Sequence, residues 1–217
     1  MIKRLIIFSI FVFSVVVAFA QPFSKEIASF RKKDSVSAPA NGVILFIGSS
    51  SFTKWQDVND YFPGYNILNR GFGGSSLTDL IFYENDILYK YQPRQIVIYC
   101  GENDLAGGDT VSGIHVFERF LRLFSGIRAK FPEVQVTFVS MKPSPSRLHL
   151  MNKMEIGNHL IKDYLSMQKN TSYVDIYHRM LNEDGTPVKE LFVQDNLHMN
   201  KAGYELWKKI IEPYLLK

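Results

Sequence analysis

Residues Val43–Trp55 read VILFIGSSSFTKW: five apolar residues run into a glycine, and three serines follow. An unbroken apolar run of this length predicts a strand that is buried on both faces, as in a parallel sheet. The three hydroxyl groups after it allow two interpretations. Either they form a polar turn that ends the strand, or one of them is a nucleophile.

Four other apolar runs resemble this one, and amphipathic helical patterns lie between them. The runs predict strands at Tyr65–Asn69, Gln95–Cys100, Val134–Ser140 and Ser172–Tyr177. Helices are predicted at Val111–Lys130, Arg147–Lys169 and Asn200–Leu216, with Asn200 as the N-cap of the last. Strands that alternate with helices predict an α/β fold in which helices cover both faces of a parallel sheet.

The segments that follow the predicted strands should carry the functional residues, because ligands of open α/β sheets bind beyond the carboxyl ends of the strands. These segments are Ser49–Ser51, Gly71–Ser75, Gly101–Asp104, Met141–Arg147 and, after a long loop, Asp195–His198. Taken alone, each is explained by ordinary turn chemistry. The glycines do not complete a dinucleotide-binding pattern, since Ser76 stands where the third glycine belongs.

Asp195 and His198 are three residues apart, so on a helical turn their side chains share a face. A carboxylate in this place accepts a hydrogen bond from one imidazole nitrogen and leaves the other nitrogen free as a base. The alternative is a metal site, which needs at least one more ligand. The other histidines show no paired spacing: His115, His149, His159 and His178. We therefore expect a base and no metal.

Together these parts match acyl transfer. That reaction needs a nucleophile, a base, a group that orients the base, and donors aimed at the developing oxyanion. A serine after the first strand, His198 and Asp195 fill the first three roles. Backbone N–H groups of the glycine loop and the side-chain amide of Asn103 fill the fourth.

The sequence resembles the SGNH hydrolase superfamily, also called GDSL esterases and lipases, over nearly all of Gly42–Tyr214. Four blocks carry the resemblance in order: Gly48-Ser49-Ser50, Gly71–Gly74, Gly101–Asp104 and Asp195–His198. The phrases GENDL, KPSPSR and DNLHMNKAGY are most similar to one branch of that family. It contains the catalytic subunits of platelet-activating-factor acetylhydrolase and bacterial lysophospholipase-like esterases.

The resemblance implies a flavodoxin-like, three-layer α/β/α sandwich with a five-stranded parallel sheet. It also selects Ser50 as the nucleophile of a triad with His198 and Asp195, working through an acyl-enzyme without a cofactor. The implied oxyanion hole consists of the N–H groups of Ser50 and Gly74 and the amide of Asn103. Ser49 replaces the aspartate of the family's first block. That aspartate is not the base, so the triad is preserved, but the choice of serine depends on this alignment.

The substrate is expected to be a carboxylic ester of a small molecule or a glycan. No segment resembles an apolar lid, which favours acetyl or short acyl groups, and the resemblance equally allows a lysophospholipid. Arg147 is a candidate substrate contact, the alternative being a helix-start charge in water. A different class, a non-catalytic carbohydrate- or lipid-binding protein on the same fold, is disfavoured because every catalytic position is filled.

Residues 1–20 have the features of a secretory signal peptide. Lys3 and Arg4 precede the apolar run Leu5–Phe19, which at about 15 residues is shorter than the ~20 that a membrane-spanning helix needs. Ala18-Phe19-Ala20 then provides a small-x-small cleavage pattern. We expect cleavage near Ala20, export to the periplasm or the medium, and no stable membrane insertion afterwards.

The remaining chain is expected to comprise an N-terminal segment, 21–41, with a short helix at Lys25–Lys32, and one hydrolase domain, 42–217. Without the two charges of the leader, the formal net charge of +4 falls to +2, too small a surplus to suggest nucleic acid as a partner. The single cysteine, Cys100, excludes an internal disulfide and is expected to be buried. The related acetylhydrolase subunits pair, so a homodimer is compatible with the resemblance.

Overall fold

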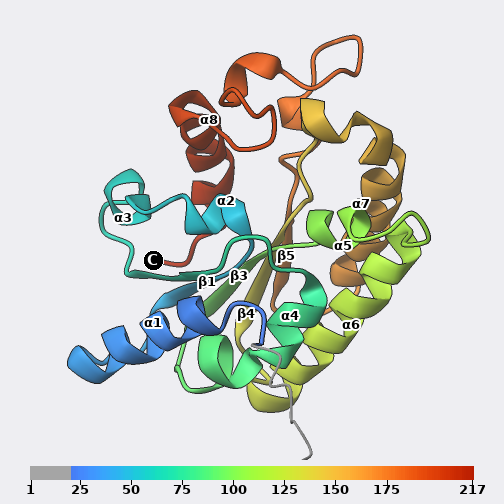
Figure 1. Cartoon of the computed structure of the whole chain (residues 1–217). Helices are drawn as coiled ribbons and strands as arrows, with labels where there is room; N and C mark the ends of the chain where they lie inside the picture. The colour runs from blue at the N-terminus through green and yellow to red at the C-terminus, as the bar shows by residue number, and fades with distance from the viewer. Residues whose placement is uncertain (1–20) are drawn as a thin grey trace, which may run out of the picture.

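A five-stranded parallel sheet forms the centre of the computed structural model, which describes residues 21–217 (Figure 1). The predicted signal peptide lies outside the described residues. The strands are β1 (Ile44–Gly48), β2 (Ile67–Gly71), β3 (Gln95–Tyr99), β4 (Gln135–Val139) and β5 (Thr171–Val174), in the spatial order β2-β1-β3-β4-β5. Every predicted strand is present, and the predicted α/β fold is confirmed.

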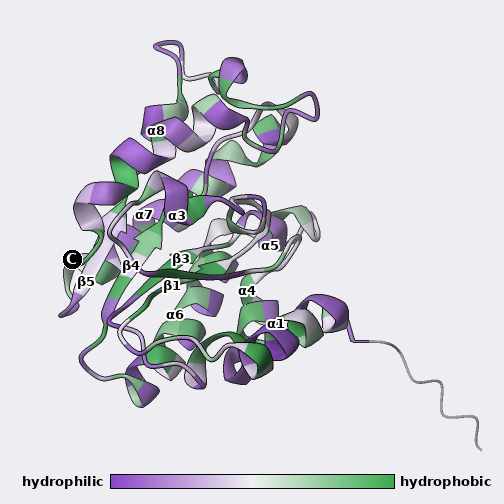
Figure 2. Ribbon diagram, turned by 90° about the vertical axis from the view of Figure 1, so that its left-hand side faces the viewer, coloured by the Kyte–Doolittle hydropathy of each residue, from purple (hydrophilic) through white to green (hydrophobic). Residues whose placement is uncertain are grey.

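Helices cover both faces of the sheet. On one face lie α1 (Ser24–Val36), α4 (Leu77–Phe82), α6 (Gly113–Lys130) and α7 (Met151–Ser166). On the other lie α2 (Ser50–Thr53), α3 (Val58–Tyr61) and α8 (Lys201–Ile211), while the short α5 (Glu102–Ala106) follows β3. Short helical turns occupy Asn85–Tyr89, Pro145–Leu150, His178–Met180, Lys189–Leu191 and Glu212–Tyr214. Figure 2 shows the apolar strands between α3 and α8 on one side and α1, α4 and α6 on the other.

The two faces of β1 belong to two separate hydrophobic clusters, because successive side chains of a strand point to opposite faces. Leu45 and Ile47 pack with the cores of α6 and α7. Ile44 and Phe46 pack with residues of α2 and α8, among them the fully buried Trp207. Both faces of β1 are therefore buried in hydrophobic cores, which explains why the VILFI run contains no polar residue.

Helix α1 is longer than the predicted Lys25–Lys32 because its last turn is attached to the sheet. Asp34 forms ion pairs with Arg70 of β2 and with Lys90, the latter at 2.5 Å. It also accepts a hydrogen bond from Tyr91 Oη at 2.7 Å. Burial raises the pKa of Asp34, but the bonds from Lys90 and Tyr91 outweigh it, and the pKa lies below its ordinary value.

Two other predicted helices differ in detail from the observed ones. The region predicted as one helix from Arg147 begins with a 3₁₀ turn, in which Arg147 has non-helical angles, and α7 starts only at Met151. The C-terminal helix ends at Ile211, before Pro213. Its predicted N-cap is confirmed, since the Asn200 side chain accepts a hydrogen bond from the Gly203 N–H at 3.1 Å.

Cys100 is buried, as predicted, and burial raises the pKa of its thiol well above the ordinary value. A buried, protonated thiol is a poor nucleophile, so this residue acts as a core side chain. Among residues 21–217, no helix has the length and apolar character needed to cross a bilayer.

The sheet reverses its winding between β1 and β3, and such a switch point is where ligands bind in this class of fold. Gly48 and Tyr99 are register partners at the ends of these two strands. Gly48 has a φ of 146°, and a Cβ at this position would lie 1.9 Å from the carbonyl oxygen of Tyr99. Glycine therefore allows the Ser49 N–H to bond that oxygen at 3.0 Å, so the serines emerge at the switch point.

We expect Gly48→Ala to destabilise the protein by at least about 3 kcal/mol, because the methyl group would collide with backbone that cannot move aside. The matched control is Gly64→Ala. Gly64 also has a positive φ, 85°, but a Cβ there would meet nothing within 4 Å. Its cost should be the conformational strain alone, about 1–2 kcal/mol. Urea unfolding of both variants measures the difference, and equal losses would contradict the close approach of β1 and β3.

Candidate active site

The three serines after β1 differ in their exposure to solvent. Ser49 and Ser51 are buried, with 5% and 1% of their surface exposed, whereas Ser50, the first residue of α2, is partly exposed. A nucleophile must reach its substrate, so exposure singles out Ser50. It is also the serine that the resemblance selects.

The glycine loop after β2 lies directly beside Ser50. A Cβ placed on Gly73 would be 4.0 Å from the Cβ of Ser50, an ordinary van der Waals distance, so the two segments are in contact. Gly74 has a φ of 87°, in the region that favours glycine. Within residues 21–217, no hydrogen bond engages the N–H of Ser50 or of Gly74. Both predicted backbone donors are therefore unpaired within this part of the chain.

The amide of Asn103 connects three segments at the rim of the sheet, which is the edge formed by the carboxyl ends of the strands. Its Nδ2 donates to Ser49 Oγ at 2.7 Å and to the carbonyl oxygen of Ser75 at 3.0 Å. Its Oδ1 accepts from Arg147 Nη2 at 2.8 Å. Because a guanidinium group can only donate, this contact determines which amide atom is the oxygen.

Both amide hydrogens of Asn103 thus have partners in this structure. For Asn103 to donate to an oxyanion, one partner must give way. Ser49 is the one that can do so, since its hydroxyl group rotates whereas the Ser75 carbonyl is part of the backbone.

Asp195 and His198 form the dyad that their spacing predicts. His198 Nδ1 and Asp195 Oδ2 are 2.6 Å apart, and the backbone N–H groups of Leu197 and His198 both donate to Asp195 Oδ1 at 2.9 Å. The hydrogen bond from the His198 side chain, helped by these backbone bonds, holds the pKa of Asp195 well below its usual range. The carboxylate is ionised and fixes the ring, which leaves Nε2 available.

Long-range contacts bring the His198 segment to the rim. The Ser146 N–H donates to the carbonyl oxygen of Asn196 at 3.1 Å, which joins this segment to the loop after β4. Helix α8, which begins just after His198, packs on α2, where Tyr204 Oη donates to the carbonyl oxygen of Ser51 at 2.9 Å. Among the described residues, no hydrogen bond links Ser50 Oγ to His198 Nε2, so that bond stays a prediction.

A pocket of about 320 Å³ opens beside the predicted oxyanion donors. Its lining is mostly polar and consists of Gly74, Ser76, Asp79, Asn103, Asp104, Gly107, Val111 and Arg119. At its base, the buried Asp104 accepts from the Leu77 N–H at 2.9 Å and from Arg119 Nη1 at 2.8 Å. Burial raises the pKa of Asp104 above its ordinary value, although the bond from Arg119 opposes the shift. Asp104 thereby ties α5 to the first residue of α4 and to α6.

Comparison with known proteins assigns the chain to a family. Residues 34–206 match the model of the GDSL-like lipase/acylhydrolase family. The chain belongs to this family. It is therefore an ester hydrolase, and the predicted resemblance is confirmed. A comparison with curated protein sequences finds no match.

Solved structures agree with this fold. A Streptococcus pneumonia protein, provisionally described as a platelet activating factor, is similar with a TM-score of 0.77 and 22% identity, covering 88% of this chain and 92% of that one. A GDSL-like lipase from Bacteroides thetaiotaomicron is similar with a TM-score of 0.73 and 16% identity, over 87% and 96%. The lipase/acylhydrolase from Enterococcus faecalis has a TM-score of 0.60 and 18% identity, over 80% and 94%. These likenesses show the three-layer fold.

Arg147 of this GDSL-family hydrolase is not a helix-start charge in water. Only 15% of its side chain is exposed, and its guanidinium group contacts Glu102 as well as Asn103. The solvated alternative is therefore wrong, while a contact with substrate stays a prediction. Sequence reasoning assigned no role to Glu102 and Lys142, which are buried beside Arg147. Their positions just after adjacent strands are the signal that indicates them.

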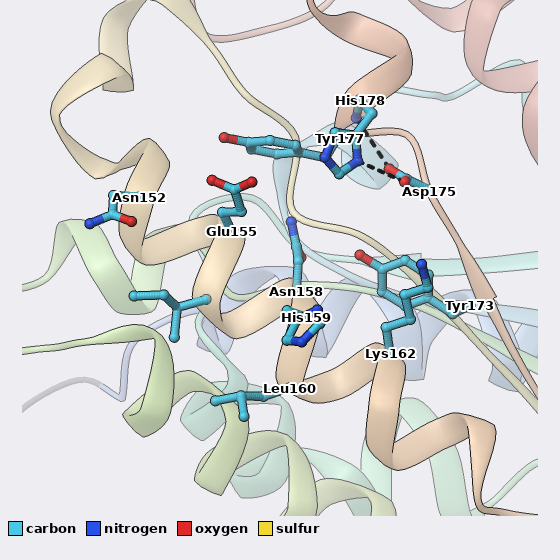
Figure 3. A pocket seen from close by; sticks show the side chains of 11 residues that line it. Asn152, Glu155, Asn158, His159, Leu160, Lys162, Tyr173, Asp175, Tyr177 and His178 are labelled. Atoms are coloured by element: carbon cyan, nitrogen blue, oxygen red, sulfur yellow. Dashed lines mark hydrogen bonds and ion pairs between the residues drawn. The ribbon is translucent and has the colours of Figure 1, made fainter. Parts of the chain in front are cut away.

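A second Asp-x-x-His pair lies at β5, and the expectation that the other histidines lack paired spacing is wrong. His178 Nδ1 and Asp175 Oδ2 are 2.8 Å apart, and the His178 N–H donates to Asp175 Oδ1 at 3.1 Å. Figure 3 shows this pair at the edge of a pocket of about 470 Å³ between β5 and α7. The described residues that line it include no serine, threonine or cysteine, so this dyad has no nucleophile of that kind beside it.

No metal centre is formed by the part of the chain that the structure describes: residues 21–217 contain no group of three or more His, Cys, Asp or Glu side chains placed to hold a metal ion. His159 Nε2 lies 3.1 Å from Asp163 Oδ2 on the exposed surface of α7.

Proposed function

We propose that this GDSL-family hydrolase is a serine esterase that cleaves short acyl esters through Ser50, His198 and Asp195. One observation carries the proposal. The partly exposed serine of the triplet stands at the switch point of the sheet, with the unpaired N–H of Gly74 and the amide of Asn103 beside it. A nucleophile next to convergent donors is the arrangement that acyl transfer needs.

In the first half-reaction, Ser50 Oγ forms a bond to the carbonyl carbon of the ester while His198 Nε2 takes its proton. The carbonyl oxygen becomes an oxyanion that accepts from the N–H groups of Ser50 and Gly74. It also replaces Ser49 Oγ as the acceptor of one Asn103 N–H. When the tetrahedral intermediate collapses, its bond to the alcohol oxygen breaks and His198 gives the proton to the leaving alcohol.

In the second half-reaction, water attacks the acyl-enzyme. His198 takes a proton from the water, the oxyanion forms again in the same donors, and collapse returns the proton to Ser50 Oγ with release of the acid. Asp195 keeps one tautomer of His198 in place and stabilises the imidazolium form.

The pocket beside Gly74 and Asn103 supports a short acyl group. Its volume is about 320 Å³ and its lining includes charged Asp79 and Arg119, which would disfavour a long hydrocarbon chain. We therefore favour acetyl and similarly short esters over long-chain lipids. The alcohol part, a carbohydrate or another polar group, would lie outside this pocket.

A panel of esters tests the proposal with the purified residues 21–217. It contains p-nitrophenyl esters of two to twelve carbons, acetylated xylan oligomers and lysophosphatidylcholine. We expect kcat/KM to be highest for the acetyl ester and to fall by about tenfold or more by eight carbons, because extra methylenes cannot enter a polar pocket. Highest activity on lysophosphatidylcholine would overturn the substrate class, and no turnover of any ester would favour the non-catalytic binding protein.

We also propose that the enzyme acts outside the cytoplasm, after cleavage near Ala20. The expectation comes from the sequence of residues 1–20. N-terminal sequencing of the protein recovered from the periplasm or medium should begin at Gln21, and a product retained with its leader would contradict export.

A further inference from the structure

A buried charged cluster lies beneath Asn103, and the mechanism above makes no use of it. Glu102 and Lys142 are 6% and 1% exposed, and Lys142 Nζ donates to Glu102 Oε2 at 3.0 Å. The backbone N–H of Lys142 donates to Glu102 Oε1 at 3.1 Å, and Tyr99 Oη donates to the same oxygen. The carboxylate is thus held by donors from β3 and from the loop after β4, so its position is rigid.

Arg147 transfers this rigidity to Asn103. Its Nη1 lies 3.3 Å from Glu102 Oε2, and its Nη2 donates to Asn103 Oδ1 at 2.8 Å. The guanidinium group is a planar fork, so once one nitrogen is bound to the carboxylate, the direction of the other is largely determined. The oxygen side of the amide is therefore held against Arg147, which turns the NH₂ side toward the Ser49–Ser50 end of β1.

The cluster also places positive charge behind the amide. Lys142 and Arg147 together carry two positive charges, and Glu102 carries one negative charge. The surplus of positive charge, together with the hydrogen bond from Arg147 to Asn103 Oδ1, polarises the Asn103 amide. This polarisation strengthens the N–H groups of the amide as donors. An oxyanion that forms next to Asn103 Nδ2 is therefore stabilised more than a neutral ester carbonyl in the same place.

We propose that Arg147 is a positioning residue of the oxyanion hole: anchored by the buried Glu102–Lys142 pair, it orients and polarises the amide of Asn103. This inference rests on the proposed function. It differs from the prediction that Arg147 binds substrate, because two of its nitrogens are already engaged within the protein. Arg147 should therefore act on the rate of the chemical step and act only through Asn103.

A double-mutant cycle on p-nitrophenyl acetate hydrolysis tests this dependence. Arg147→Met should lower kcat by about 10- to 100-fold and change KM by less than about threefold, because a misplaced donor acts mainly on the transition state. Asn103→Ala should lower kcat by about 10²–10³-fold. In the double variant, kcat should lie within about threefold of Asn103→Ala alone, since the two residues act as a unit.

Two further variants separate positioning from folding. Arg147→Lys keeps a positive charge for Glu102 but has no second prong for Asn103, so we expect thermal stability to be retained while kcat falls about tenfold. Arg128→Met is the matched control. Arg128 donates to backbone oxygens of Val134, Lys169 and Asn170, away from Asn103, so its loss should lower stability and leave kcat unchanged.

The outcomes are distinct. Three results would each overturn the positioning role. The first is a double variant whose loss in kcat equals the product of the two single losses. The others are a rise in KM with unchanged kcat in Arg147→Met, and full activity of Arg147→Lys. If Ser50→Ala is inactive and Arg147→Met has wild-type kcat, only this inference fails. If Ser50→Ala retains wild-type activity, the proposed function fails. Inhibition by phenylboronic acid, whose tetrahedral anion occupies the oxyanion hole, should weaken in Arg147→Met in parallel with kcat.

Discussion

Replacement of Ser50 by alanine is expected to lower kcat for p-nitrophenyl acetate by about 10⁴-fold or more, because no acyl-enzyme can form. The side chain is partly exposed at the start of α2 and makes no hydrogen bond within residues 21–217, so its removal should change the unfolding free energy by less than about 1 kcal/mol. Steady-state kinetics and urea unfolding measure the two effects on one preparation. A fluorophosphonate probe should label the wild-type protein at Ser50 and leave the variant unlabelled.

The neighbouring serines supply matched controls for this substitution. Ser51→Ala removes a buried hydroxyl group that has no hydrogen-bond partner among the described residues, so activity and stability should both stay close to wild type. Ser49→Ala removes the acceptor of one Asn103 N–H, and its effect on kcat should be within about tenfold, since the nucleophile remains. Activity that survives in Ser50→Ala but disappears in Ser49→Ala or Ser51→Ala would show that the alignment is displaced by one residue.

The second large effect is expected for His198→Gln, with a loss in kcat of about 10⁴-fold, because the serine loses its base. The chain provides a closely matched control in His178→Gln. His178 has the same bond to an aspartate three residues earlier, at 2.8 Å against 2.6 Å for His198, but its side chain is 62% exposed and belongs to the pocket between β5 and α7. This variant should keep kcat within about twofold.

The lowered pKa of Asp195 determines how this residue contributes to stability at different pH values. The folded-state pKa of Asp195 is depressed, so its ionised form persists below the pKa of about 3.9 that it would have in the unfolded chain. Its contribution to stability is present above that value and is lost as the pH falls through the lowered pKa. We therefore expect the titration of Asp195 to cause no loss of activity between pH 5 and 8. If His178→Gln abolished turnover while His198→Gln did not, the catalytic dyad would be assigned to β5.

Several features were determined by the sequence alone, because they depend on neighbours along the chain. The unbroken VILFI run predicted a strand buried on both faces, and Asn200 predicted the N-cap of the last helix; both are observed. The alternation of strands and helices predicted the parallel sheet, and this sheet then predicted that the residues after each strand would gather at one rim. The family blocks named the same segments.

Other features were decided only by the tertiary structure. The family resemblance selects Ser50 from three consecutive serines, but their exposure is set by the fold, which buries Ser49 and Ser51 and leaves Ser50 accessible. Two Asp-x-x-His pairs have the same local geometry but different surroundings. The bond from Ser146 to Asn196 joins the Asp195–His198 segment to the loop after β4, whereas Asp175 and His178 line the pocket between β5 and α7.

Arg147 gives the clearest example of this difference. In the sequence it is a charge after a proline-rich loop, with no indication of its partners. In the fold it bridges Glu102 and Asn103, which lie more than 40 positions away along the chain. Periodicity reports which side of its own element a residue occupies. The partner of a polar side chain depends on which other strand ends beside it, and that is established only when the sheet has assembled.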